Sequence, residues 1–111
     1  MGTKQQTIVE VESGMRTSPG QQFHDVAVTI ERRGAMWRIQ IVEQSGSNQG
    51  RLEVHRRKEV VKRDSDWKIA LRRAESAARE IGMEIEYLVQ ALSEAADKMY
   101  DALETDEPKT D

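Results

Sequence analysis

The stretch "AREIGMEIEYL", residues 78–88, decides the fold, because Gly82 lies inside a run that otherwise has the pattern of a helix. If the chain breaks at Gly82, two shorter helices follow the rest of the domain. If it does not break, one helix runs from about residue 65 to residue 104. Such a helix is too long for a domain of 111 residues to cover, so it implies a partner.

The spacing of apolar residues favours the single helix. They recur after alternating steps of four and three, at Trp67, Leu71, Ala74, Ala78, Ile81, Ile85, Leu88, Leu92, Ala95, Met99 and Ala102. This is heptad spacing, and its phase does not change at Gly82. No Ser, Thr, Asp or Asn lies near Met83 to cap a new helix. We therefore expect one long C-terminal helix, and a kink or break at Gly82 is the alternative.

The first half of the chain has the alternating pattern of strands. Such segments cover about residues 7–12, 24–33, 36–44 and 51–62, the last long or bulged, with turn signals at Gly34 and in "SGSNQG" (45–50). The sequence predicts an α+β fold in which a four-stranded antiparallel meander (about 7–62) precedes the helix, with Asp64 or Ser65 as its N-cap. Residues 1–104 form one domain, and residues 105–111 form a disordered acidic tail.

Charge changes sign along the chain, and this gradient is more informative than the total of −3. Residues 1–50 are neutral, with five basic and five acidic residues. Residues 51–79 have ten basic and five acidic residues, and residues 80–111 have two basic and ten acidic residues. The middle of the chain is thus a basic segment, and the C-terminal part is strongly acidic.

The sequence lacks the residues that several functional classes require. There is no cysteine, and the two histidines, His24 and His55, have no metal-ligand spacing. No glycine-rich loop precedes a helix start, and no nucleophile motif is present. The sequence predicts a protein that is not an enzyme and has no cofactor or metal. No signal peptide or apolar run of membrane-spanning length is present either, so we expect a cytoplasmic protein.

The leading hypothesis is a homo-oligomeric interaction or accessory protein that assembles through its C-terminal helix. The sheet cannot reach the second half of a helix of this length, so that half needs a partner helix. The expected interface residues are Ile85, Leu88, Leu92, Ala95, Met99 and Leu103. Because the helix begins basic and ends acidic, we expect two copies to pair with antiparallel helices, as a homodimer or larger assembly.

The alternative hypothesis is a nucleic-acid-binding factor. Clustered Lys and Arg residues are the electrostatic signature of phosphate binding. The candidate polyanion-binding residues are Arg56, Arg57, Lys58, Lys62, Arg63, Lys68, Arg72 and Arg73, in the fourth strand and the helix start. Acidic residues interrupt this segment, so the competing explanation is a solvated face, or one that pairs with the acidic half of another copy.

Overall fold

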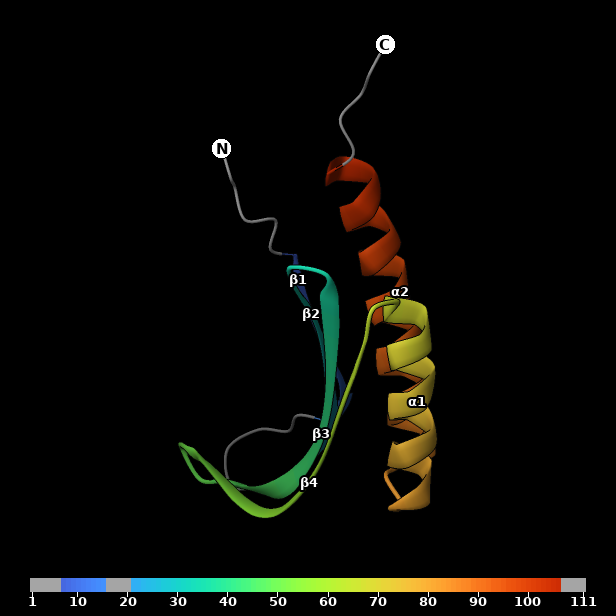
Figure 1. Ribbon diagram of the computed structural model, residues 1–111. Coiled ribbons are helices and arrows are strands. Elements are labelled where there is room, and N and C mark those ends of the chain that lie inside the picture. The colour runs from blue at the N-terminus through green and yellow to red at the C-terminus, as the bar shows by residue number, and fades with distance from the viewer. Residues whose placement is uncertain (1–6, 16–20, 107–111) are drawn as a thin grey trace.

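The computed structural model describes residues 7–15 and 21–106 and has an α+β fold, with one antiparallel sheet followed by two helices (Figure 1). The strands are β1 (Ile8–Met15), β2 (Gln21–Arg33), β3 (Met36–Asn48) and β4 (Leu52–Asp64), and the helices are α1 (Trp67–Glu80) and α2 (Ile85–Asp106). The strands pair in chain order, so β1 and β4 are the edges of the sheet. The predicted four-stranded meander is confirmed.

The second predicted turn, residues 45–50, is wrong in its position. β3 continues to Asn48, and the chain turns only between β3 and β4, at residues 49–51. Gly46 lies instead at a bulge, where the register between β3 and β4 shifts. A Cβ atom on Gly46 would collide with the Glu53 carbonyl oxygen, so glycine here permits a close backbone approach within the sheet. The predicted long or bulged fourth strand is confirmed.

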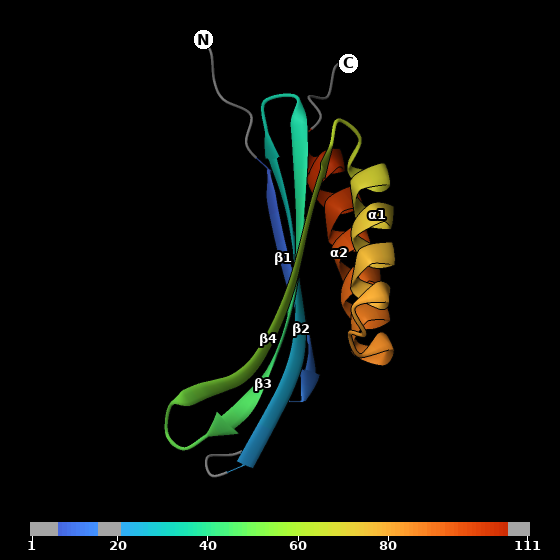
Figure 2. The same cartoon turned by 60° about the horizontal axis from the view of Figure 1, so that its bottom comes forward.

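Both helices cover the same face of the sheet (Figures 1 and 2). α1 packs on β3 and β4, while α2 packs on β1 and β2. Beyond the helices, the far end of the β3–β4 hairpin curls away from them (Figure 2). The sheet therefore has one face that α1 and α2 cover and one face that neither of these described helices covers.

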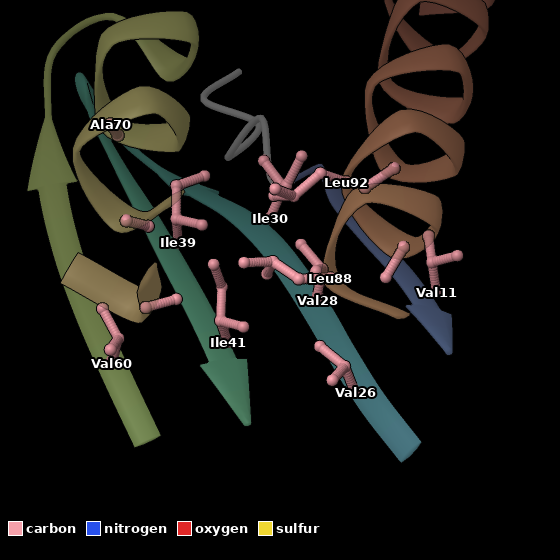
Figure 3. Close-up of a cluster of buried hydrophobic side chains, with 14 of the residues drawn as sticks. Val11, Val26, Val28, Ile30, Ile39, Ile41, Val60, Ala70, Leu88 and Leu92 are labelled. Atoms are coloured by element: carbon pink, nitrogen blue, oxygen red, sulfur yellow. The ribbon is translucent and has the colours of Figure 1, made fainter. Parts of the chain in front are cut away.

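The core lies between the sheet and the helix pair, and Figure 3 shows its side chains pointing from the strands toward both helices. Val28 and Ile30 of β2 and Ile39 and Ile41 of β3 are wholly buried. They alternate with more exposed residues along each strand, because successive side chains point to opposite faces. Trp37 also belongs to this core, as its shared face with Ile39 predicts.

The chain breaks at Gly82, so the expectation of one long helix is wrong. Gly82 has φ +80°, a left-handed conformation that favours glycine. Its N–H donates to the Arg79 carbonyl at 3.1 Å, and the Met83 N–H donates to the Ala78 carbonyl at 3.0 Å. These two bonds form a Schellman motif, which closes α1 with glycine in the position after the C-cap.

The start of α2 explains why the break escaped sequence reasoning. Glu84 acts as the missing cap, because its carboxylate accepts a hydrogen bond from the Glu86 N–H at 3.1 Å. Glutamate is not among the preferred N-cap residues. The buried Glu43 carboxylate of β3 accepts a further bond from the Glu84 N–H at 3.0 Å. A residue far away in the sequence thus satisfies a helix-start donor, and local patterns cannot show this.

The other end of α1 also differs by one or two residues from the prediction. Its N-cap is Asp66, whose carboxylate accepts from the Lys68 N–H at 2.9 Å, and not Asp64 or Ser65. Asp64 instead accepts a bond from the Asp66 N–H at 3.0 Å. At the C-terminus, α2 continues to Asp106, so two residues of the expected tail are helical. Residues 107–111 lie outside the described residues.

Candidate nucleic-acid interface

The fold converts the charge gradient of the sequence into two differently charged sides. β4 and α1, which hold the basic segment, lie together at one edge of the sheet, because α1 turns back beside the strand that precedes it. α2, which holds six acidic residues and one lysine, lies over β1 and β2 toward the other edge, where β1 adds Glu10 and Glu12. One lateral side of the molecule is therefore basic, and the opposite side is acidic.

The alternation of β4 divides the basic strand residues between the two faces of the sheet. Arg56, Lys58 and Lys62 share the face of buried Val60, which is the helix face. Arg57 and Arg63 point to the opposite face. The basic residues therefore surround the β4 edge and do not form one surface.

Two hollows lie beside β4 and α1 on the helix side. The first has a volume of about 470 Å³ and is lined by Lys62, Arg72, Arg73, Ser76, Ala77 and Glu80. The second lies at the end of α1, because α1 runs antiparallel to β4, and is lined by Arg56, Arg57, Lys58 and Gly82 together with His24, Glu43, Ser45 and Glu84. We call this surface, which comprises both hollows, the β4–α1 groove. Its basic residues are Arg56, Lys58, Lys62, Arg72 and Arg73.

Three of these five side chains have no acidic partner within the part of the chain that the structure describes. They are Arg56, Lys62 and Arg72, and all three are exposed. Arg73 lies 3.4 Å from the Asp64 carboxylate but remains 61% exposed. Lys58 donates to the Gly82 carbonyl at 3.2 Å and lies 3.8 Å from Glu43, so it is largely occupied. The groove thus presents three open cations and a fourth that is weakly held.

The side chains of the remaining predicted polyanion-binding residues are engaged elsewhere or point to the other face. Arg57 borders the hollow at the end of α1, but its guanidinium donates to Glu59 at 3.0 Å on the opposite face, which it shares with Arg63. The Lys68 ammonium lies over the rings of Trp67 and Tyr100, at 5.9 Å and 5.2 Å from their centroids. This contact joins the start of α1 to α2 and directs Lys68 away from the groove. The structure therefore brings together five of the eight predicted residues.

A second polar cluster surrounds His24 at the end of the helix pair. His24 Nε2 lies 2.7 Å from the Glu43 carboxylate, and its ring meets Tyr87 edge-on at 5.2 Å. Ser45 is the cross-strand neighbour of His24, yet no hydrogen bond joins these two described side chains. The His24–Glu43 pair therefore connects β2 and β3 to the turn at Glu84 and does not activate a hydroxyl. The signal for Glu43 was present in the sequence, because alternation places this charged residue on the face of Trp37, Ile39 and Ile41.

The structure changes the environment of the expected oligomer interface. Leu88, Ala95 and Met99 are wholly buried and Leu92 is nearly so, against the protomer's own sheet and α1. The argument that the sheet cannot reach this half of the helix is therefore wrong, since the turn at Gly82 returns α2 over β1 and β2. Ile85 is 41% exposed and Leu103 is half-buried. Self-association as such stays a prediction.

Comparison with protein-family models, curated proteins and solved structures finds no match for this chain. Within residues 7–15 and 21–106, no three His, Asp or Glu side chains are grouped as a metal site would require. In the same residues, neither helix combines the length and apolar character of a membrane span. The function must therefore be argued from the groove and the faces of the sheet.

Proposed function

We propose that the protein is a non-enzymatic accessory factor that binds double-stranded nucleic acid through the phosphates, using the β4–α1 groove. The observation that supports this most directly is the set of open cations, Arg56, Lys62 and Arg72, on one side of an acidic chain. Cations that remain open in one groove are suited to a polyanion.

The dimensions of the groove agree with a nucleic-acid backbone. Arg56 and Lys62 are six residues apart on one strand, which corresponds to about 20 Å. This length equals the rise of about six base pairs of duplex. Arg72 and Arg73 on α1 form the second wall beside Lys62. A phosphate backbone lying along β4 can thus meet cations from two elements.

The described residues that line the β4–α1 groove include no Phe, Tyr or Trp, which favours a duplex over a single strand. Proteins that bind single strands without sequence preference stack bases on aromatic side chains. Phe23, Trp37 and Trp67 are buried. Tyr87 packs on His24, and Tyr100 of α2 contacts Trp67 and Lys68 of α1. Among the described residues, the groove therefore has cations and no stacking surface. Phosphate contacts of this kind are independent of base sequence.

The test is a fluorescence-anisotropy titration with a duplex and with a single strand of equal length, at several salt concentrations. Three phosphate contacts give a slope of roughly −3 for log Kobs against log salt, and dissociation constants of about 10⁻⁴ to 10⁻⁶ M. We expect the triple variant Arg56→Gln, Lys62→Gln, Arg72→Gln to flatten this slope to near zero. Two duplexes of unrelated sequence should lose affinity equally.

The matched control is Arg32→Gln, Arg33→Gln, Arg79→Gln, which changes the net charge by the same amount outside the groove. Arg33 and Arg79 are exposed and already paired with Glu31 and Glu75. The control should retain most of the wild-type affinity. Equal losses in the two triple variants would contradict the groove as the site. Stronger binding to the single strand would contradict the choice of a duplex, and the absence of binding at low salt would contradict the function.

A further inference from the structure

The sheet face opposite the helices has an uncharged centre. Ala27 and Thr29 of β2, Gln40 and Val42 of β3 and Val61 of β4 lie next to one another across the strand register. All five side chains are half-buried. In the described part of the chain, no helix covers this side of the sheet (Figures 1 and 2). We call this surface the open face.

Around the uncharged centre, Asp25, Glu31 and Arg38 lie toward the ends of the two central strands, where Arg38 is 3.8 Å from Glu31. The other charges lie at the margins of the open face, and their sign differs between the two edges. Glu10 and Glu12 form the β1 margin, where alternation places them opposite the buried valines of that strand. Arg57, Glu59 and Arg63 form the β4 margin. Glu59 already accepts hydrogen bonds from Gln40 and Arg57. The β1 margin is therefore acidic, and the β4 margin is basic on balance.

We infer that the open face binds the open face of a second copy of this chain, across a two-fold axis parallel to the strands. Such an axis lays β1 of one copy over β4 of the other. The strand register then sets Glu10 and Glu12 over Val61 and Glu59, one side-chain step along the strand from Arg63 and Arg57. A two-fold axis perpendicular to the strands would lay β1 on β1 and set glutamates against glutamates. Charge therefore favours the axis parallel to the strands.

The centre of the face suits this packing. Ala27, Thr29 and Val42 are small, so two sheets can approach to the usual separation of about 10 Å. Eight residues on each of four strands give about 26 Å by 19 Å, or about 500 Å² per copy. The total of about 1,000 Å² is at the lower limit for a specific interface. The dimer is therefore weak and depends on protein concentration.

This interface does not depend on the proposed binding of nucleic acid. The alternation of β4 directs Arg57 and Arg63 to the open face, and Arg56 and Lys62 to the β4–α1 groove. The two surfaces share a strand but use different side chains. Failure of one proposal therefore leaves the other standing, and the two are measured separately.

The first test is sedimentation equilibrium from 5 to 500 µM with Val42→Asp and Val89→Asp. Val42→Asp places an unpaired charge at the centre of the proposed interface and should raise the dimer dissociation constant at least tenfold. Val89 is 45% exposed on α2 and offers the same substitution outside the open face. Val89→Asp should dimerise like the wild type. Circular dichroism should show that both variants remain folded.

The second test exchanges charges at the margins. Glu10→Arg alone and Arg63→Glu alone should each weaken self-association at least fivefold, because residues 10 and 63 of the two copies then carry like charges at both margins. An equimolar mixture of the two variants should restore dimers, since each mixed contact pairs Arg with Glu. A mixture that stays monomeric would overturn the proposed orientation. A wild-type protein that is monomeric at 500 µM, or a dimer lost in Val89→Asp and kept in Val42→Asp, would overturn the interface.

Discussion

The two faces of the sheet are built from the same strands, yet they differ in side-chain size and in what covers them. On the helix face, Val28, Ile30, Ile39 and Ile41 are fully buried by the protomer's own helices. On the open face, their immediate neighbours along the strands are small or polar, and none of the described helices lies over them. The helix face depends on large branched side chains that fill the space under two helices. The open face has small or uncharged side chains at its centre and charge at its margins.

The difference shows how burial within a protomer and burial by a partner leave different patterns in a sequence. Burial within the protomer selects large aliphatic residues at every second position, which alternation makes visible. A partner that binds weakly selects only the removal of charge from the centre of a surface. The helix face could therefore be predicted from the sequence, and a partner for the open face could not.

The largest expected effect comes from truncating the helix face. Ile39→Ala removes a fully buried side chain and should lower the free energy of unfolding by about 2–5 kcal/mol. Val42→Ala, three residues along the same strand on the other face, should cost less than about 1 kcal/mol. Urea denaturation at low micromolar concentration, below the range in which the proposed dimer forms, measures both values. Equal losses would show that the two faces do not differ in this way.

A smaller effect is expected at the turn that brings α2 over the helix face. Gly82 has φ +80°, and a Cβ atom there would lie 3.7 Å from the nearest side-chain atom, Lys58 Nζ. Space is therefore sufficient, and the cost of Gly82→Ala is backbone strain of about 1–2 kcal/mol. Gly82→Asn should cost less, because asparagine adopts this conformation more easily. Thermal unfolding of the two variants gives the comparison.

The opposite outcome at Gly82 is also informative. If alanine joined α1 and α2 into one long helix, the second half would leave the sheet and expose Leu88 and Met99. The variant would then be more helical and would form larger assemblies, as the sequence hypothesis assumed. Circular dichroism together with sedimentation distinguishes this from simple destabilisation.

Most of the fold could be predicted from local patterns. The alternation of Val26, Val28 and Ile30 and of Trp37, Ile39 and Ile41 correctly indicated paired strands with one apolar face. The heptad spacing also identified residues that are buried on α1 and α2, but it assigned the wrong partner to the second half. Both helices of a returning pair face one sheet, so their apolar stripes can keep a common phase across a tight turn. Phase alone therefore could not exclude the break at Gly82.

The candidate site was predicted less completely, for a related reason. The basic segment was visible as clustered Lys and Arg, but which of these side chains share a groove depends on the side of β4 and on the return of α1. Lys68 was included because it follows the helix start, and its contact with Tyr100 involves residues 32 positions apart. Glu43 was missed because its role depends on the Glu84 N–H across the fold. Long-range contacts decide these assignments.

A still smaller loss of stability is expected at the start of α1, one of the two helices that cover the helix face. Asp66 caps the helix through the Lys68 N–H, so Asp66→Ala should cost about 1 kcal/mol. Ser65→Ala is the neighbouring control and should change stability by less than about 0.5 kcal/mol. A larger loss at Ser65 than at Asp66 would contradict the assignment of the cap. The urea midpoints of the two variants decide the comparison.

The smallest effect is expected on the open face, at Glu59. The Gln40 amide and then Arg57 donate hydrogen bonds to this exposed carboxylate and hold its pKa below the usual range. A pKa that is lower in the folded than in the unfolded state stabilises the protein above the unfolded value, and this contribution is lost as pH falls through the folded value. Wild type should therefore melt slightly above Glu59→Gln at pH 7, and the difference should shrink as pH falls below the ordinary carboxyl range and vanish below the lowered pKa of Glu59. Gln40→Ala keeps the Glu59 carboxylate but removes its strongest hydrogen-bond donor. The pH-dependent difference in melting temperature between this variant and the double variant Gln40→Ala/Glu59→Gln should therefore be smaller. An unchanged difference in this second pair would show that Gln40 does not set the pKa of Glu59, and that the centre of the open face is less ordered than its hydrogen bonds indicate.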